Sequence, residues 1–307
     1  MGDILIAAVL TIITAATPLV YASIGEMITE KAGVLNLGVE GMMLMGAVCG
    51  FAAVNATDSA TMGIIVGMLA GSALSLIFAV LVLGFQATQV ATGLALTIFG
   101  IGISSLIGQD LVGIAYDGLP KLPIPGLSAI PVAGTLLFNH DILVYGSFVL
   151  IFLVSWFLKS TRSGLVLRAV GDSHDAAHAI GYHVIRIRYM AILFGGAMSG
   201  LAGAYLSLSY SPLWIENMSA GRGWIALALV VFATWRPWRV FTGAYLFGGI
   251  TILQLHAQAL GIGVPAQVMS MLPYVATIIV LVLISQDHNK IKLNAPACIG
   301  KPFHPTL

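Results

Sequence analysis

Long apolar runs, interrupted by short polar stretches, occupy most of the chain. A helix needs about 20 mostly apolar residues to cross a bilayer, because it rises about 1.5 Å per residue and the hydrocarbon layer is about 30 Å thick. The pattern predicts an all-α polytopic transmembrane bundle of about eight to ten spans. We expect spans at residues 4–24, 39–54, 62–84, 91–108, 141–158, 189–210, 223–235, 240–256 and 266–285. The runs 39–54 and 223–235 are short, which indicates broken or partial helices.

Composition agrees with a single membrane domain over residues 1–307. Of the 307 residues, 59% are hydrophobic and 8% are charged, whereas about 25% are charged in an ordinary soluble domain. The net charge of +1 gives no electrostatic footprint for nucleic acid. Cys49 and Cys298 stand in different contexts and are expected to be free thiols.

Lysine and arginine gather in a few polar stretches, and such stretches face the cytoplasm in membrane proteins. They are the loop 159–188 with Lys159, Arg162, Arg168, Arg186 and Arg188, the turn with Arg236 and Arg239, and the tail 286–307 with Lys290, Lys292 and Lys301. The loop 109–140 holds Lys121 beside Asp110 and Asp117, so it is expected outside. Nine spans then place the N-terminus outside, and Asp3 favours a retained first helix over a signal peptide.

Glycine pairs four residues apart recur in the apolar runs. They are Gly46 and Gly50, Gly67 and Gly71, and Gly196 and Gly200. This spacing lets helix backbones approach closely in lipid, so we interpret the pairs as packing sites.

The chain carries no phosphate-binding loop for ATP. In "CIGKPF", residues 298–303, Pro302 replaces the required Ser or Thr, and Ala295 stands where the first glycine belongs. Ionisable residues within the apolar runs are sparse, whereas ion-coupled carriers usually place several there.

The stretch "EKAGVLNLGVEG", residues 30–41, interrupts an apolar region with glycines and places Asn36 and Glu40 four apart. Polar groups inside a membrane are costly unless they are paired or face a water-filled path. We interpret the stretch as a broken helix that lines or gates the route of a polar solute. The alternative is an interfacial turn whose polar groups satisfy the backbone.

A second polar cluster is "FQATQVATG", residues 85–93, in which Gln86, Gln89 and Thr92 recur every three residues. Amides donate and accept hydrogen bonds without charge, which suits a neutral polar solute. Hydrogen bonding between helices explains the cluster equally well.

The stretch "GDSHDAAHAIGYHVIRIRY", residues 171–189, is polar between two apolar runs. Asp172 or Ser173 can cap a short helix that Gly181 ends. Such a helix is too short to be stable in water unless it packs against other protein, so we expect it to be a docking site for a partner protein on the cytoplasmic side. A loop helix on the membrane surface is the alternative. His174, His178 and His183 lack further ligands, which favours a solvated helix face over a metal site.

Within that stretch, "DAAHAIG" resembles the EAA---G signature of ABC importer permeases, with Asp in place of Glu. The stretches "GEMITEKAGVLNLGVEGMMLMGA" (25–47), "GRGWIALALVVFATWRP" (221–237) and "APACIGKPF" (295–303) extend the likeness over nearly the whole chain. Together they resemble nucleoside-type permeases associated with basic-membrane-protein lipoproteins, which are related to ribose and branched-chain amino-acid permeases.

The resemblance implies a multi-pass permease subunit in the bacterial cytoplasmic (inner) membrane. It also implies three protein partners: a second permease subunit that completes a heterodimer, an ABC ATPase subunit that holds ATP-Mg, and a substrate-binding lipoprotein. This chain itself would need no cofactor. The short cytoplasmic coupling helix would consist of Asp175, Ala176, Ala177 and Gly181, flanked by Arg168 and Asp172, and Asn36 and Glu40 would be pathway or gating positions.

The expected function is therefore nucleoside import driven by ATP hydrolysis in the partner subunit. A sugar or a branched-chain amino acid is the alternative solute, and a stand-alone secondary carrier is the alternative class. An enzyme is disfavoured, because no nucleophile–base pair or metal-ligand set appears.

Overall fold

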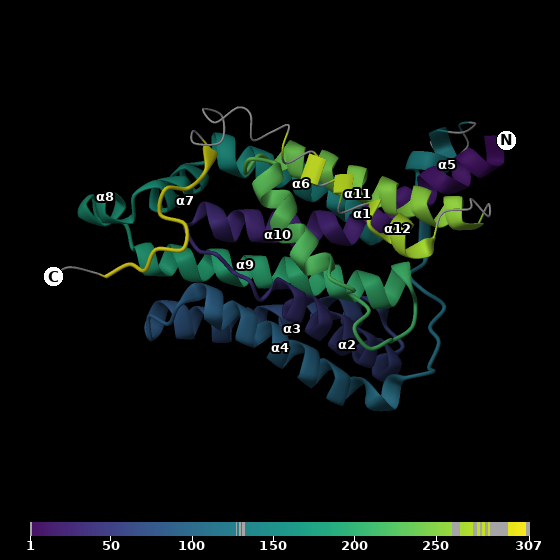
Figure 1. The fold of residues 1–307 in the computed structure, drawn as a ribbon, viewed down its shortest axis with the longest axis horizontal. Coiled ribbons are helices and arrows are strands. Elements are labelled where there is room, and N and C mark those ends of the chain that lie inside the picture. The colour runs from purple at the N-terminus through teal and green to yellow at the C-terminus, as the bar shows by residue number, and fades with distance from the viewer. Residues whose placement is uncertain are drawn as a thin grey trace.

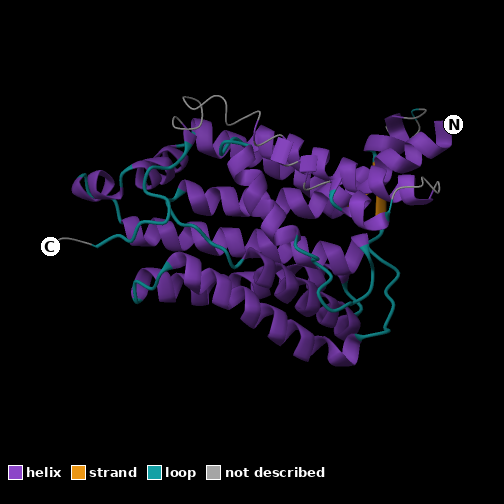
Figure 2. Cartoon of the chain, viewed as in Figure 1, coloured by secondary structure: helices purple, strands orange, loops and turns teal. Residues whose placement is uncertain are grey.

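The structure, a computed structural model, describes residues 2–126, 133–259, 265–272 and 294–304, with single positions 128, 130, 275, 276, 278, 279 and 282. In chain order its helices are α1 (Gly2–Lys31), α2 (Val39–Thr57), α3 (Ala60–Ala79), η1 (Val80–Gly84), α4 (Gln89–Gly108), η2 (Gln109–Leu111), α5 (Ala133–Leu137), α6 (Ile142–Ser160), α7 (Arg162–Asp172), α8 (His174–Ala179), α9 (Val184–Tyr205), η3 (Leu206–Tyr210), α10 (Arg222–Phe232), α11 (Pro237–Ala259) and α12 (Ala266–Ser270). Helices dominate the described chain (Figure 2). In the loop expected at 109–140, β1 (Lys121–Pro123) pairs antiparallel with β2 (Asn139–Asp141).

Seven described helices are long and apolar enough to cross a membrane. They cover Ile6–Lys31, Val39–Thr57, Ala60–Gly84, Gln89–Leu111, Ile142–Ser160, Val184–Tyr210 and Pro237–Gln258. These seven confirm seven of the nine expected spans, and the short run at 39–54 proves to be a full-length helix. The expected span 223–235 is the 11-residue α10, which at about 1.5 Å per residue cannot cross alone. Most of the expected span 266–285 lies outside the described residues.

The helix α9 is the centre of the bundle, where it packs against α1, α2 and α3 (Figure 1). Of its apolar window, 83% is buried, the largest share among the seven spans. The glycine pairs meet here: a Cβ on Gly46 or Gly71 would clash with the backbone of α9 at Gly196 or Gly200. The packing interpretation of these pairs is confirmed, because only glycine permits backbones this close.

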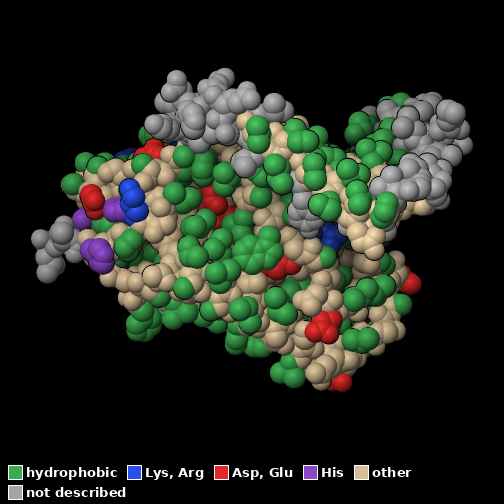
Figure 3. Space-filling model, in the orientation of Figure 1, with side chains coloured by type: hydrophobic (Ala, Val, Ile, Leu, Met, Phe, Trp, Pro, Cys, Tyr) green, Lys and Arg blue, Asp and Glu red, His purple; other side chains and the backbone are tan. Residues whose placement is uncertain are grey.

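The two ends of the bundle differ in composition. The start of α1 lies at the end opposite α8 (Figure 1), which is the relation that the charge pattern predicts for the N-terminus and the loop 159–188. In Figure 3, hydrophobic side chains cover much of the face in view, and histidine gathers with Lys and Arg at the left end, which holds α8. We call this end of the bundle the α8 end.

Exposed apolar side chains such as Leu69, Ile98 and Phe152 suit a surface that faces lipid.

Candidate functional site

The predicted short helix exists as α8. Its N-cap is Ser173, whose hydroxyl accepts a hydrogen bond from the amide of Ala176 at 3.3 Å. At its C-terminal end Gly181 adopts φ +93°, a conformation that glycine enters without strain. The amide of Tyr182 then donates to the carbonyl of Ala177 at 3.1 Å, which closes the last turn. Both sequence-predicted ends of the helix are confirmed.

The loop that carries α8 contains a second helix that the sequence pattern did not indicate. α7 begins after Thr161, whose hydroxyl accepts from the amide of Gly164 at 3.0 Å. Gly164 is close enough to the end of α6 that a Cβ there would clash with the carbonyl of Phe157. The chain therefore turns sharply from the membrane-spanning α6 into α7, and α7 leads directly into α8.

The C-terminal tail packs onto these two helices. The amide of Cys298 donates to the carbonyl of Gly171 at 2.9 Å, and the Phe303 ring lies 5.2 Å from the ring of His174 and 5.4 Å from that of His178. His174 is buried, so a solvated face is wrong for that residue, although His178 is exposed. We call α7, α8 and residues 294–304 together the α7–α8 unit.

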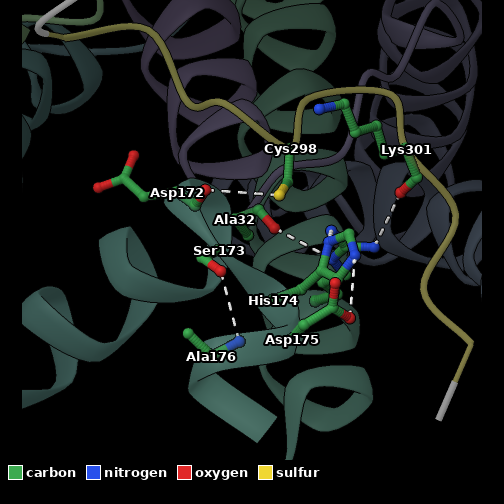
Figure 4. A network of polar contacts seen from close by, with 9 residues as sticks. Ala32, Asp172, Ser173, His174, Asp175, Ala176, Cys298 and Lys301 are labelled. Carbon is green, nitrogen blue, oxygen red and sulfur yellow. Dashed lines mark hydrogen bonds and ion pairs between the residues drawn. The ribbon is translucent and has the colours of Figure 1, made fainter. Parts of the chain in front are cut away.

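A buried arginine joins this unit to the bundle. Arg188 is fully buried on α9, and its Nε donates to the carbonyl of Ala32 at 3.1 Å. Its Nη1 donates to the carbonyl of Lys301 at 3.2 Å, and Nη2 lies 3.2 Å from Nδ1 of His174 (Figure 4). Burial first, and then the Arg188 guanidinium, lower the pKa of His174, so the ring is neutral at pH 7 and accepts the Arg188 hydrogen bond.

The six predicted coupling residues divide by exposure. Asp172, Asp175, Ala176 and Gly181 are exposed at the α8 end, and Arg168 is partly buried. Ala177 instead packs inward with Val170, Val184 and Phe303. An added Cβ on Gly181 would meet open space. The unit thus presents a surface of small and acidic side chains on a base that is packed and hydrogen-bonded to the bundle.

The segment between α1 and α2, residues 32–38, runs as non-helical backbone inside the bundle. The amide of Leu35 donates to Oε1 of Gln89 at 2.7 Å, and the hydroxyl of Thr97 donates to the carbonyl of Leu37 at 2.9 Å. Asn36 is buried, and its Oδ1 accepts from the amide of Gly38 at 2.9 Å. Such backbone is tolerated at membrane depth only where protein buries it or it lines a cavity. The segment joins two separate spans, α1 and α2, so it is a buried link between helices where the sequence predicted a break within one. α4 supplies its hydrogen-bond partners.

Two carboxylates hold the ends of the short helix α10. At its start, Glu40 accepts hydrogen bonds from the hydroxyl of Ser219 at 2.5 Å and from the amides of Gly221 and Gly223 at 2.8 and 2.6 Å. Just past its end, Nε1 of Trp235 donates to Oε2 of Glu30 at 2.5 Å. Both carboxylates are buried. The helix macrodipole favours the negative charge of Glu40 at this N-terminus.

The other predicted pathway residues lie on the turn between η1 and α4 and in the first turn of α4. Gln89 and Thr92 are buried in α4, whereas Gln86 is exposed with φ +57°. Gln86 and Gln89 line a cavity of about 210 Å³ that Arg188 and Phe303 close from the other side. The structure thus brings Gln89 to the 32–38 segment and places Gln86 at the α8 end. Glu40 lies apart from both, at α10. No metal-ligating cluster occurs among the described residues.

Seven apolar spans with an exposed helical unit at one end define a multi-pass helical membrane protein. Residues 8–281 match the family described as branched-chain amino acid transport system / permease component, and the chain belongs to this family. It is 38% identical over 314 residues to a putative glucose ABC transporter permease protein of Haloferax volcanii, covering 95% of each chain.

Two further relatives are 32% identical to the chain. One is a guanosine ABC transporter permease protein of Bacillus subtilis, with 87% of this chain and 88% of the relative covered. The other is a nucleoside ABC transporter permease protein of Lactococcus lactis subsp. cremoris, with 87% and 89% covered. No solved structure matches the chain. The protein is accordingly a transport component of the ABC type.

Proposed function

We propose that this chain is the permease subunit of an ATP-driven importer for nucleosides and that it works beside a second permease subunit. The observation that carries the proposal is the α7–α8 unit, a rigid helical surface outside the spans of a protein with no phosphate-binding loop of its own. Such a surface suits an ATPase subunit, because hydrolysis has to be supplied from outside this chain. Two of the three relatives described above carry guanosine or nucleoside in their names.

A sugar is the second candidate solute. It is favoured by the 38% identity to the putative glucose permease of Haloferax volcanii. Neutral hydrogen-bonding groups such as Gln86, Gln89 and Thr92 suit either a sugar or a nucleoside, so the residues of this chain do not separate the two.

The solute is tested by uptake in cells that contain the whole importer. Deleting this chain is expected to abolish uptake of radiolabelled guanosine at micromolar concentration and to leave glucose uptake unchanged, and uptake is expected to return when the chain is supplied again. The opposite pattern, with glucose uptake lost and guanosine uptake intact, overturns the nucleoside assignment in favour of the sugar.

The proposed coupling surface consists of Asp175, Ala176 and Gly181 with Asp172 and Arg168 beside them, and Ala177 shapes it from within. Replacing Ala176 by tryptophan places a large ring on an exposed position without disturbing the buried face of α8. We expect Ala176→Trp to abolish copurification of the ATPase subunit and ATP-dependent uptake, while the melting temperature of the chain stays unchanged.

Ala56 provides a matched control, because it is an exposed alanine near the end of α2, away from the α7–α8 unit. Ala56→Trp is expected to retain the ATPase subunit and uptake. If Ala176→Trp also retains both, the ATPase does not dock on α8.

We further propose that Asn36, Glu40, Gln86, Gln89 and Thr92 border the solute pathway. The non-helical segment 32–38 supports this placement, because buried non-helical backbone beside the spans offers polar groups of the kind with which transporters hold polar solutes. Glu40 would act there by fixing α10 and not by contacting solute, since three hydrogen bonds to the start of α10 already occupy its carboxylate.

A further inference from the structure

A groove opens at the α8 end between α6, α7 and α9, away from the cavity at Gln86. Its volume is about 590 Å³, and its apolar wall includes Phe157, Val166 and Met190. Arg162 and Arg186 also line it, and both are exposed. Neither the coupling surface nor the pathway residues proposed above lie in this groove.

The groove lies where the spans leave the membrane. The span in α6 ends at Ser160, and the span that begins α9 starts at Val184. Trp156, one turn before the end of α6, and Trp238, at the start of α11, are both exposed, and Trp238 packs edge-on against Phe152 of α6 at 4.9 Å. Exposed tryptophans gather at the boundary between lipid tails and headgroups. The groove therefore spans that boundary.

The exposed apolar surface continues from the groove toward lipid. Met190 in the wall is 69% exposed, and Leu165 on the neighbouring α7 is 58% exposed. A soluble protein rarely leaves side chains of this kind open to water beside a pocket, whereas a bilayer covers them. The apolar part of the groove thus suits a hydrocarbon chain.

The polar part of the groove has an uncompensated positive charge. No acidic residue lines it, and neither Arg162 nor Arg186 forms an ion pair with any described residue. A guanidinium binds a phosphate through two parallel hydrogen bonds, which makes arginine the preferred partner of that group. Two unpaired arginines above an apolar groove therefore match an anionic headgroup above acyl chains.

We propose that this groove is a binding site for an anionic phospholipid of the surrounding bilayer. The headgroup phosphate binds between Arg162 and Arg186, and an acyl chain packs on Phe157 and Met190. Because α7 forms one wall of the groove, the bound lipid fastens the base of the α7–α8 unit to the membrane.

The test is native mass spectrometry of the purified full chain in detergent, titrated with dioleoyl phosphatidylglycerol or dioleoyl phosphatidylcholine. These lipids share their acyl chains and differ in headgroup charge. We expect the wild type to bind phosphatidylglycerol more tightly than phosphatidylcholine. In R162Q/R186Q the dissociation constant for phosphatidylglycerol is expected to rise about fivefold for each arginine removed. Binding of phosphatidylcholine is expected to change little.

Two matched variants isolate the groove from net charge. R236Q/R239Q also removes two exposed arginines at the α8 end, but neither lines the groove, so it is expected to bind phosphatidylglycerol as the wild type does. R162K/R186K keeps the charge and is expected to retain part of the preference. All variants are first shown to be monodisperse by size-exclusion chromatography.

The proposal is overturned if the wild type binds the two lipids with equal affinity. It is also overturned if R162Q/R186Q prefers phosphatidylglycerol as strongly as the wild type does. A third outcome also overturns it: R162Q/R186Q binds lipid normally but loses the ATPase subunit in lipid-free detergent. That result would show that the ATPase subunit, and not a lipid, binds at the two arginines. None of these results depends on which solute is imported.

Discussion

Replacing Arg188 by methionine is expected to release the C-terminal tail from the α7–α8 unit and to lower the melting temperature of the purified protein. The substitution keeps the buried volume but leaves the carbonyls of Ala32 and Lys301 and Nδ1 of His174 without the donor that each has now. An unsatisfied buried polar group costs about 1–3 kcal/mol. Ala32 and His174 are buried and Lys301 is exposed, so we expect a total cost of about 2 kcal/mol or more.

Cys298 reports directly on this release. Its side chain is buried against the carbonyl of Asp172, 3.5 Å from Sγ, so a water-soluble maleimide is expected to label it slowly in the wild type and much faster in Arg188→Met. A Cys49→Ser background removes the other free thiol. Arg236→Met, at an exposed arginine of the same end, serves as control and is expected to leave labelling unchanged. Equal labelling of Arg188→Met and wild type would show that other contacts hold the tail.

Replacing Glu40 by alanine is expected to destabilise the bundle and to abolish transport. The change removes the acceptor of three hydrogen bonds, two of them from backbone amides at the first turn of α10. Hydrogen bonds to a charged group contribute about 1.5–3 kcal/mol each, and the carboxylate also loses its interaction with the helix macrodipole. We expect a loss of about 3 kcal/mol or more, measured as a lower melting temperature in detergent.

Glu216 is the matched control for Glu40. It is an exposed carboxylate on the segment that precedes α10, and its Oε1 accepts a hydrogen bond from Ser105 at 2.8 Å. An exposed interaction of this kind contributes little, so Glu216→Ala is expected to change stability by less than about 0.5 kcal/mol. A Glu40→Ala protein that melts with the wild type but fails to transport would assign Glu40 to the solute pathway and not to the support of α10.

The membrane spans and the short helix α8 could be predicted from the sequence because they depend on local order. Apolar length decides whether a segment can span, and capping residues such as Ser173 and Gly181 act within a few positions of the helix that they end. The glycine pairs could be interpreted as packing sites for the same reason, since their spacing places both glycines on one face of one helix. The helix that packs against that face could not be predicted.

The contacts of the candidate site could not be predicted in this way. Glu40 and Ser219 are 179 positions apart, and Arg188 and Lys301 are 113 apart. Nothing near Phe303 indicates that its ring covers His174, and nothing near Arg188 separates this buried arginine from the exposed Arg186 two positions before it. Periodicity shows which side of a helix is apolar, but not which distant backbone carbonyl lies opposite a charged side chain.

By itself the sequence determined that this protein is a polytopic helical bundle with a polar interruption near residue 36 and a capped helix between two spans. These features follow from hydrophobic length and local hydrogen bonding. Only the tertiary structure decided that the tail and α8 form one unit, that Arg188 joins it to the backbone just after α1, and that Glu40 and Glu30 hold α10. The reason is that a buried charged group is stable only where several remote partners meet, and that meeting exists only in the folded chain.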